Sequence, residues 1–421
     1  MFLLLYSGIG LIAVCVGALL TLNIKNIFGA NMTVAEIDKT RIMLWLMTFN
    51  LAITFPMSIW GSIMTAYERF VFQRVVSIVR GVLNPIVMIT LLIVGYKAIA
   101  MVIVTTAFNV VTLFVNYWYC KHRLHISVRF GRFNWGFLKE VSIYSSWIFL
   151  NAIMDRIYWS TGQFVLGIYR GTVAIAVYAV AIQLQSMYHL FSTAVSSVFL
   201  PKVTAMVTRG EDNCAISDLF VRTGRIQYIV MAYILTAFIV FGRPFIQIWA
   251  GMGYEDSYVI ALLFFVPLTV PLIQNIGITI LQARNQMRFR CISYIIVSLA
   301  SLGLSIPMAK YYGGIGCAVA TSIALTLGHV IIMNIYYRRK QSIAIYAFWR
   351  EILKMSIVPL LLGTISMVSF HMFCIKLTHI PIFLLCVFAF SALYMPLFWR
   401  FSMNESERML FLQPLRRIIH K

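Results

Sequence analysis

The sequence contains few charged residues and very few acidic ones. Of its 421 residues, 11% are charged and only 13 are Asp or Glu, whereas 61% are hydrophobic. A soluble globular domain carries about 25% charged residues, so a soluble domain of ordinary composition is excluded. The composition instead predicts a protein that is embedded in a lipid bilayer.

Motifs for cofactors are also absent. The seven cysteines are scattered singly, without a Cys-x-x-Cys pair or a histidine spacing that would suit a metal ion. No connection between hydrophobic segments carries a Gly-rich phosphate-binding motif, so ATP-driven pumping by this chain has no support. We therefore expect no cofactor and no enzymatic activity.

What the sequence does contain is a series of long hydrophobic runs. About twelve of them reach the roughly 20 residues that a helix needs to cross about 30 Å of hydrocarbon. They lie near residues 2–22, 43–65, 75–95, 99–119, 142–167, 173–199, 226–248, 257–282, 291–310, 315–337, 353–374 and 380–399. A transmembrane barrel would show segments of about ten residues that alternate in polarity, and none is present. The sequence thus predicts an all-α, polytopic membrane bundle of about 12 transmembrane helices.

The basic residues indicate how the chain crosses the membrane. Most Lys and Arg residues fall in alternate connections, for example at Arg69 to Arg80 and at Lys202 to Arg225, and in the C-terminal tail. The positive-inside rule places these connections, and both chain ends, in the cytoplasm. Topology and contact with anionic phospholipids explain most of the net charge of +21, so nucleic-acid binding is not expected.

The stretch Met43 to Arg123 recurs as Ile260 to Lys340, with equivalent residues about 217 positions apart. The matching marks are Pro56 with Pro271, Gly61 with Gly277, and Asn116-Tyr-Trp-Tyr119 with Asn334-Ile-Tyr-Tyr337. This offset spans six predicted helices, an even number, so both copies should enter the membrane in the same direction. Parallel repeats of this kind build the two halves of some secondary transporters.

The repeat predicts how the chain is organised. Residues 1–124 form a partial N-terminal lobe of four helices, 125–141 a cytoplasmic linker, 142–340 a six-helix C-terminal lobe, and 341–421 a terminal helix pair with a basic cytoplasmic tail. The helices at 142–199 have no counterpart, so the N-terminal lobe is predicted to lack two helices. Either the duplication lost them, or the reading frame begins upstream of Met1.

Asp155 is the acidic residue that stands near the centre of a predicted span. An ionised carboxylate at the bilayer centre costs at least a few kcal/mol, so it should face a partner or a water-filled cavity. The neighbouring Arg156 points about 100° away around the helix and is not an ideal partner. Both residues are candidates for substrate binding or ion coupling, and the alternative is a buried charge that fixes helix packing.

Four further polar residues are candidates for the same site. Gln163 and Gln185 suit sugar hydroxyls or phosphate oxygens, although amides also bond neighbouring helices. Arg80 lies inside the third span and could bind a phosphate bidentately, or extend to the nearest interface. Asn275 lies beside Pro271, where proline loosens the helix.

Several segments together resemble the polysaccharide-type lipid flippases of the multidrug/oligosaccharidyl-lipid/polysaccharide exporter superfamily. They are Asp155-Arg-Ile-Tyr-Trp-Ser-Thr-Gly-Gln-Phe-Val-Leu-Gly167, Gly242-Arg-Pro-Phe-Ile-Gln-Ile-Trp249 and Ala283-Arg-Asn-Gln-Met-Arg-Phe289. The resemblance covers essentially the whole chain. Relatives of this kind usually have fourteen helices, in two lobes of six and a terminal pair.

The resemblance implies a function in the bacterial inner membrane. Such proteins move an undecaprenyl-pyrophosphate-linked oligosaccharide, a repeat unit of O-antigen or capsule, to the outer leaflet by alternating access. It also implies that Arg80 and Arg156 contact the pyrophosphate and that Asp155 couples an ion or orients an arginine. Polysaccharide polymerase or assembly proteins would be possible partners.

Two other functions stay open at this point. A drug/cation antiporter of the same superfamily would want several carboxylates in the membrane, and the single Asp155 with several arginines argues against it. A membrane protein that helps to assemble a polysaccharide synthase without transporting anything is the second alternative, which a shortened N-terminal lobe would favour.

Overall fold

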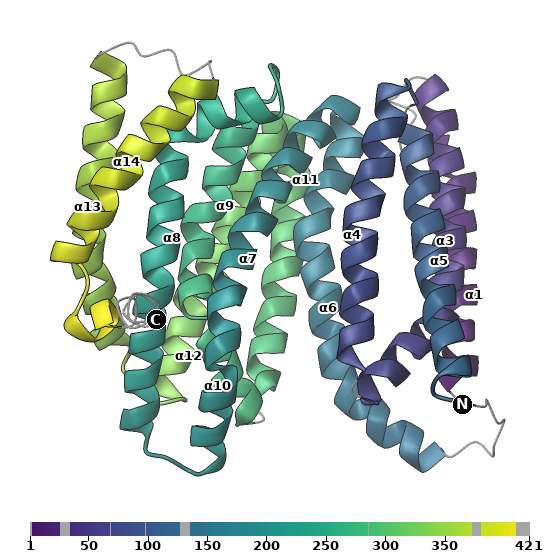
Figure 1. Cartoon of the computed structure of the whole chain (residues 1–421), viewed down its shortest axis with the longest axis horizontal. Coiled ribbons are helices and arrows are strands. Elements are labelled where there is room, and N and C mark those ends of the chain that lie inside the picture. Colours follow the sequence, from purple (N-terminus) through teal and green to yellow (C-terminus); the bar gives the residue numbers. More distant parts are fainter. Residues whose placement is uncertain are drawn as a thin grey trace, which may run out of the picture. The chain divides into compact units, whose positions relative to one another are not determined.

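The computed structural model describes residues 2–25, 34–67, 69–96, 98–126, 135–284, 286–372 and 380–409, and in these residues it contains helices and no strands (Figure 1). The predicted linker segment 127–134 and the basic tail from residue 410 lie outside the described residues. The chain divides into unit 1, Met1–Val141, and unit 2, Ser142–Lys421. The predicted lobe boundaries stay a prediction.

Ten helical segments in the described part of the chain are long and apolar enough to cross a membrane. One of them, Met287–Arg339, covers two of the predicted spans, and α6 (Trp135–Tyr169) covers another. Within the described residues every predicted span thus corresponds to one or more helical segments, and the predicted all-α membrane bundle is confirmed. The chain is a multi-pass membrane protein.

Unit 1 contains α1 (Phe2–Leu22), α3 (Val34–Ala66), α4 (Phe70–Ile93) and α5 (Ala98–His122). α3 packs against both α1 and α5, and α4 lies mainly against α5. Many hydroxyls in these helices, such as that of Thr48, donate to the carbonyl oxygen four residues earlier. These bonds satisfy the hydroxyl within its own helix, so it can lie in an apolar environment at small cost.

Unit 2 is larger and has a continuous core. Besides most of α6 it contains α7 (Thr172–Thr208), α8 (Asn213–Trp249), α9 (Asp256–Ile273), α10 (Ile276–Ala283), α11 (Met287–Leu325), η1 (Thr326–Ile332), α12 (Met333–Arg339), α13 (Ile345–Met372) and α14 (Ile380–Phe401). α9 contacts α7, α8 and α11, and most of its residues are buried. Its hydrophobic side chains, Phe264 among them, therefore form the centre of this unit.

Three irregularities interrupt the helices of unit 2. α9 ends at Ile273, shortly after Pro271, and α10 begins at Ile276, as expected where proline removes a backbone hydrogen bond. Gly313 kinks α11 with φ of 60° and ψ of −138°. After α11 the chain continues as the π-helical segment η1, which nothing in the sequence pattern predicts. Short π-helical segments are frequent at functional sites.

The repeat predicted from the sequence is visible in backbone hydrogen bonds. The turns that follow α3 and α10 are closed by equivalent bonds, and so are the turns that follow α5 and α12. From amide to carbonyl, the bonds are Tyr67 to Ile63, Arg69 to Met64, Arg123 to Tyr119 and Ile126 to Cys120 in unit 1, and Arg284 to Ile280, Gln286 to Leu281, Lys340 to Tyr336 and Ile343 to Tyr337 in unit 2. Every one of these residues is displaced by 217 positions from its equivalent. The structure therefore confirms the predicted offset.

An aromatic pair repeats at the same offset. Phe72 stacks on Tyr119 with ring centroids 3.9 Å apart and an interplanar angle of 17°. Phe289 stacks on Tyr336 at 4.1 Å and 6°. In both units the pair joins the first turn of one helix to the last turns of another, so the repeat extends to side-chain packing.

His125 and Ser342, again 217 residues apart, both have a positive φ, of 49° and 54°. Positive φ is uncommon for residues other than glycine, so the two turns share an unusual backbone conformation. This register differs slightly from the sequence alignment, in which Asn116 is paired with Asn334 at an offset of 218. In the structure the counterpart of Asn116 is Met333, and Asn334 is one position further along.

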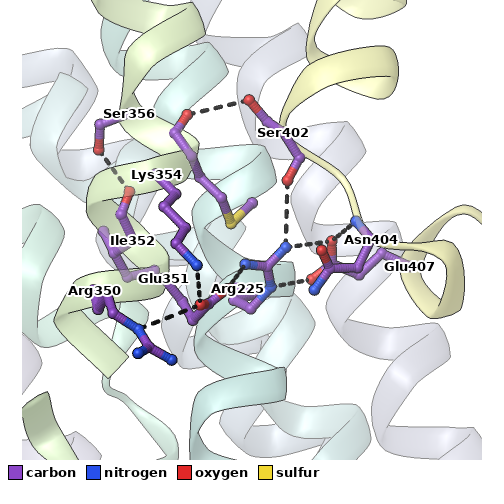
Figure 2. Close-up of polar contacts among 10 residues, drawn as sticks. Arg225, Arg350, Glu351, Ile352, Lys354, Ser356, Ser402, Asn404 and Glu407 are labelled. Carbon is purple, nitrogen blue, oxygen red and sulfur yellow. Dashed lines mark hydrogen bonds and ion pairs between the residues drawn. The ribbon is translucent and has the colours of Figure 1, made fainter. Parts of the chain in front are cut away.

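A buried ion cluster joins α8 to α13 and to the segment after α14 (Figure 2). Nε and Nη2 of Arg225 donate to the two carboxylate oxygens of Glu407, at 2.6 and 3.0 Å. Nη1 donates to Glu351 Oε2 at 2.7 Å, and Nη2 also donates to the carbonyl of Ser402 at 3.3 Å. The backbone amide of Asn404 donates to Glu407 Oε2 at 2.9 Å. The cluster thereby fixes the end of α14 to the body of unit 2.

The sequence indicates only that Arg225 and Glu407 lie in connections on the cytoplasmic side, where basic residues should meet lipid headgroups. For Arg225 that expectation is wrong. Arg225 is 4% exposed and Glu407 is 2% exposed. The charge of Arg225 is therefore balanced inside the protein and not by lipid headgroups, because the carboxylates of Glu407 and Glu351 both accept hydrogen bonds from its guanidinium.

We expect Arg225→Met to lower the stability of the purified protein strongly. The substitution leaves Glu407 buried without its counter-charge, and removal of one partner of a buried ion pair costs about 3–5 kcal/mol. The melting temperature in detergent should fall by at least about 6 °C.

Arg222→Met is the matched control, because Arg222 is exposed one turn earlier on α8. Its melting temperature should equal that of the unmodified protein. The double variant Arg225→Met/Glu407→Met should regain much of the loss, because an apolar pair replaces a buried ionic one with little penalty. Equal melting temperatures of Arg225→Met and Arg222→Met would show that the buried ion cluster does not stabilise the protein.

Candidate functional site

Arg80 in unit 1 is held by polar side chains from two neighbouring helices, which we call the Arg80 cluster. Its Nη1 donates to Oδ1 of Asn109 on α5 at 3.1 Å. Nδ2 of Asn109 lies 2.6 Å from Oδ1 of Asn50 and 2.7 Å from the hydroxyl oxygen of Thr54, both on α3, and donates to them. The guanidinium is thus held against α5 inside unit 1.

The Arg80 cluster belongs to a polar stripe on α4. Gln73, Ser77, Arg80 and Asn84 are spaced by four, three and four residues, so they lie on one face of the helix. Nε2 of Gln73 donates to the carbonyl of Gly61 on α3 at 2.7 Å. Oδ1 of Asn84 is buried and has no hydrogen-bond partner among the described residues. An apolar membrane helix therefore carries polar groups along three turns of one side.

Asp155 in unit 2 has a defined partner. Its Oδ1 accepts a hydrogen bond from the hydroxyl of Tyr294 on α11 at 2.7 Å. The Tyr294 ring stacks with Tyr158, one turn after Asp155, at 5.8 Å, and the Tyr158 hydroxyl donates to the carbonyl of Thr321 at 2.7 Å. Tyr294 is buried while Asp155 is exposed. The carboxylate is therefore held from one side and accessible from the other.

Other ionisable groups surround this pair, and we call the whole set the Asp155 cluster. The His329 ring of η1 packs edge-on against Tyr294 at 5.2 Å, and the guanidinium of Arg290 lies 5.8 Å from the centre of the same ring. The Asp155 carboxylate also interacts electrostatically with His189 of α7. From the sequence alone His329 is a lone histidine without a role, and its place in the cluster follows from the π-helical segment.

The predicted residue Asn275 lies at the break between α9 and α10. Its Nδ2 donates to the hydroxyl of Ser196 on α7 at 2.9 Å. The adjacent Gln274 donates to Oδ1 of Asn334 at 2.9 Å, and the indole of Trp349 donates to the same oxygen at 3.0 Å. These bonds join four helices where the α9 backbone is broken, so Asn275 acts here as a contact between helices.

The remaining predicted residues have fewer contacts. Arg156 is exposed, Gln163 is half-buried and Gln185 is buried. In the described part of the chain no ion pair joins Arg156 to Asp155, as their angular separation on α6 leads one to expect. Arg80 belongs to unit 1, and the other five predicted residues belong to unit 2.

The partners of Arg80 and Asp155 were not predicted from the sequence. Asn109 was detectable in principle, since it is a carboxamide in the middle of the apolar run 99–119. Tyr294 carried no such signal, because the chain has 21 tyrosines and tyrosine is common in membrane helices. Its pairing with Asp155 bridges 139 residues of sequence.

The two clusters differ in what they can bind. A guanidinium has five N–H donors, and Asn109 takes one of those of Arg80, which leaves others for a phosphate. A carboxylate that is hydrogen-bonded by a tyrosine can take up a proton or a cation from its open side. Among the described residues, no group of three or more His, Cys, Asp or Glu side chains could hold a metal ion.

Comparisons with known proteins bear on the family and the fold. Residues 6–259, more than half of the chain, match the family of polysaccharide biosynthesis proteins. No curated protein sequence matches the chain. Among solved structures, the lipid II flippase MurJ in an inward closed conformation is similar, with a TM-score of 0.73 and 18% sequence identity over 98% of this chain and 84% of that one. The chain thus shares the all-helical fold of that structure, and it belongs to the polysaccharide biosynthesis protein family.

Proposed function

We propose that this protein translocates a lipid-linked oligosaccharide across the bacterial inner membrane for the synthesis of a surface polysaccharide. The family match and the fold of a lipid II flippase support this function. The observation that carries it is the Arg80 cluster, in which a guanidinium is held within apolar helices by Asn109 with donors to spare. A guanidinium so placed suits the diphosphate of a polyprenyl-linked glycan.

The proposed transport follows alternating access, with the polar part of the substrate inside the protein and its lipid tail in the bilayer. Arg80 and the exposed Arg156 are each proposed to contact the diphosphate. Gln163, Gln185 and Asn275 are proposed to contact glycan hydroxyls, because amide side chains both donate and accept hydrogen bonds. The two parts of such a substrate need different partners. A diphosphate only accepts hydrogen bonds and suits arginine, whereas a sugar hydroxyl both donates and accepts and suits an amide.

Asp155 is proposed to couple transport to an ion. Ionised, the carboxylate accepts the Tyr294 hydrogen bond; protonated, it loses the charge that strengthens that bond. The packing of α6 against α11 thereby depends on the ionisation of Asp155. Such a dependence is what a proton-coupled conformational change requires.

The membrane topology belongs to the same proposal. Both chain ends are proposed to face the cytoplasm, where the basic connections meet anionic phospholipids. Polymerases and assembly proteins of the polysaccharide are proposed partners at the outer side, where the translocated substrate would be consumed.

Deletion of the gene should cause lipid-linked oligosaccharide to accumulate and surface polysaccharide to disappear in the host. Re-expression of the intact protein should reverse both changes. Mass spectrometry of extracted lipids and blotting of surface polysaccharide measure the two effects. Surface polysaccharide that persists at its normal level in the deletion strain would exclude the proposed function.

In the same strain, Asp155→Asn and Tyr294→Phe should each slow export by about tenfold or more, because each removes a hydrogen bond to a charged group. The double variant should be no slower than the worse single one, since both act on one bond. Tyr312→Phe is the control, because Tyr312 is an exposed tyrosine of the same helix. Additive losses in the double variant would show that the pair does not act as a unit.

Arg80→Gln should reduce export more than Arg80→Lys, because lysine keeps the charge but not the planar fork of donors. Export is measured as the rate at which surface polysaccharide reappears after induction. Arg123→Gln, at an exposed position after α5, serves as control. Export by Arg80→Gln at the rate of Arg123→Gln would remove Arg80 from the substrate site.

A further inference from the structure

Unit 1 contains a polar cavity of about 270 Å³ near the ends of its helices. It lies between the last turn of α3, the first turns of α4 and the last turns of α5. Its lining residues are Thr65, Gln73, Arg74, Val76, Ser77, Thr112 and Asn116. This volume is many times the roughly 10–15 Å³ that a single water needs, so the space is far more than a packing defect. We call it the unit 1 cavity.

Some polar side chains that line the unit 1 cavity have hydrogen-bond partners in the protein, and one does not. Gln73 is fixed by the carbonyl of Gly61, and the Thr112 hydroxyl is satisfied by the carbonyl of Phe108. Oδ1 of Asn116, in contrast, is buried and has no hydrogen-bond partner among the described residues. A buried acceptor without a donor costs free energy, so it marks a place where a ligand or water donates.

Arg74 supplies the charge of the cavity. It is exposed, and no carboxylate of the described chain forms an ion pair with it. On α5, Lys121 lies near the same end, over the ring of Tyr117 at 5.8 Å. The cavity therefore combines a cationic entrance with an unpaired acceptor at its wall.

Equivalent positions of the repeat surround a second cavity, in unit 2. Five of the lining positions of the unit 1 cavity, displaced by 217 residues, line this cavity of unit 2 as well. The equivalents of Gln73, Val76, Ser77, Thr112 and Asn116 are Arg290, Ser293, Tyr294, His329 and Met333.

The two equivalent cavities differ in volume. In unit 2 the space is reduced to about 10 Å³, room for a single water at most. The larger side chains Tyr294 and His329 fill it, where unit 1 has Ser77 and Thr112. One copy has thus been closed by its own side chains and used to hold Asp155, while the other has stayed open and polar.

We propose that the unit 1 cavity binds the phosphate-bearing headgroup of a membrane lipid. The Arg74 guanidinium contacts the phosphate, for which its fork of donors is suited. Asn116 Oδ1 accepts a hydrogen bond from a headgroup hydroxyl or ammonium group. The position supports a lipid, because the cavity lies where α3 ends and α4 begins. Both helices are long and apolar enough to cross a membrane, and the ends of such helices meet the polar headgroups.

The site does not require that the protein transports anything, so binding is measured on the purified chain. Native mass spectrometry in detergent compares retention of short-chain phosphatidylglycerol, whose glycerol carries hydroxyl donors, with short-chain phosphatidylcholine, whose headgroup has no donor. The intact protein should retain phosphatidylglycerol better.

The repeat itself supplies the variants. Ser77→Tyr introduces the residue that closes unit 2, and Arg74→Gln removes the charge; each should weaken retention of phosphatidylglycerol about tenfold or more. Val76→Ser also copies unit 2 but fills nothing, so it is the matched control and should bind as the intact protein does. Asn116→Leu should abolish the preference for phosphatidylglycerol over phosphatidylcholine. Melting temperatures identify any variant that fails to fold.

A short-chain prenyl diphosphate, added in competition, distinguishes the source of the ligand. Displacement of phosphatidylglycerol by it assigns the cavity to a diphosphate-bearing lipid, and failure to displace assigns it to a bilayer phospholipid; either result supports a headgroup site. Equal retention by the intact protein, Ser77→Tyr and Arg74→Gln would overturn the proposal. Loss of export in cells with binding intact would leave this site standing.

Discussion

The structure depends on one constraint: polar groups inside a bilayer must find their partners within the protein, because lipid offers none. Small hydroxyls meet it locally, as Thr48 does by donating to its own helix. Two charged groups in the described membrane helices meet it through contacts between helices. Arg80 is tied to α5 through Asn109, and Asp155 is tied to α11 through Tyr294.

The buried ion cluster of Arg225, Glu351 and Glu407 satisfies the same constraint with the largest number of charges. Three charged side chains from α8, α13 and the segment after α14 are brought together, and the backbone of two further residues completes their hydrogen bonds. Apolar residues could hold the same three elements together with less penalty. An ionic cluster instead admits one arrangement only, so it fixes how the terminal helix pair of unit 2 is seated.

The positions of the membrane spans were predicted from the sequence, because they depend on hydropathy. The spans were predictable because a helix of about 20 apolar residues in lipid has no alternative structure, and Arg80 and Asp155 were conspicuous because charge is rare there. Their partners were not predictable. Asn109 and Tyr294 are ordinary side chains whose importance arises from tertiary contacts, 29 and 139 residues away. The burial of Arg225 was hidden for the opposite reason, since a charge next to a span looks like a solvated one.

The constant offset between the two units has a consequence for how such a protein can change. From Ile63 to Ile126, and from Ile280 to Ile343, the two copies have the same length even though few side chains match. One inserted residue would rotate the rest of a helix by about 100° and turn its polar stripe toward lipid. Substitution has been free to make one copy hollow and the other solid, while insertion and deletion have been barred. Helix phase, rather than residue identity, is what these two halves have inherited.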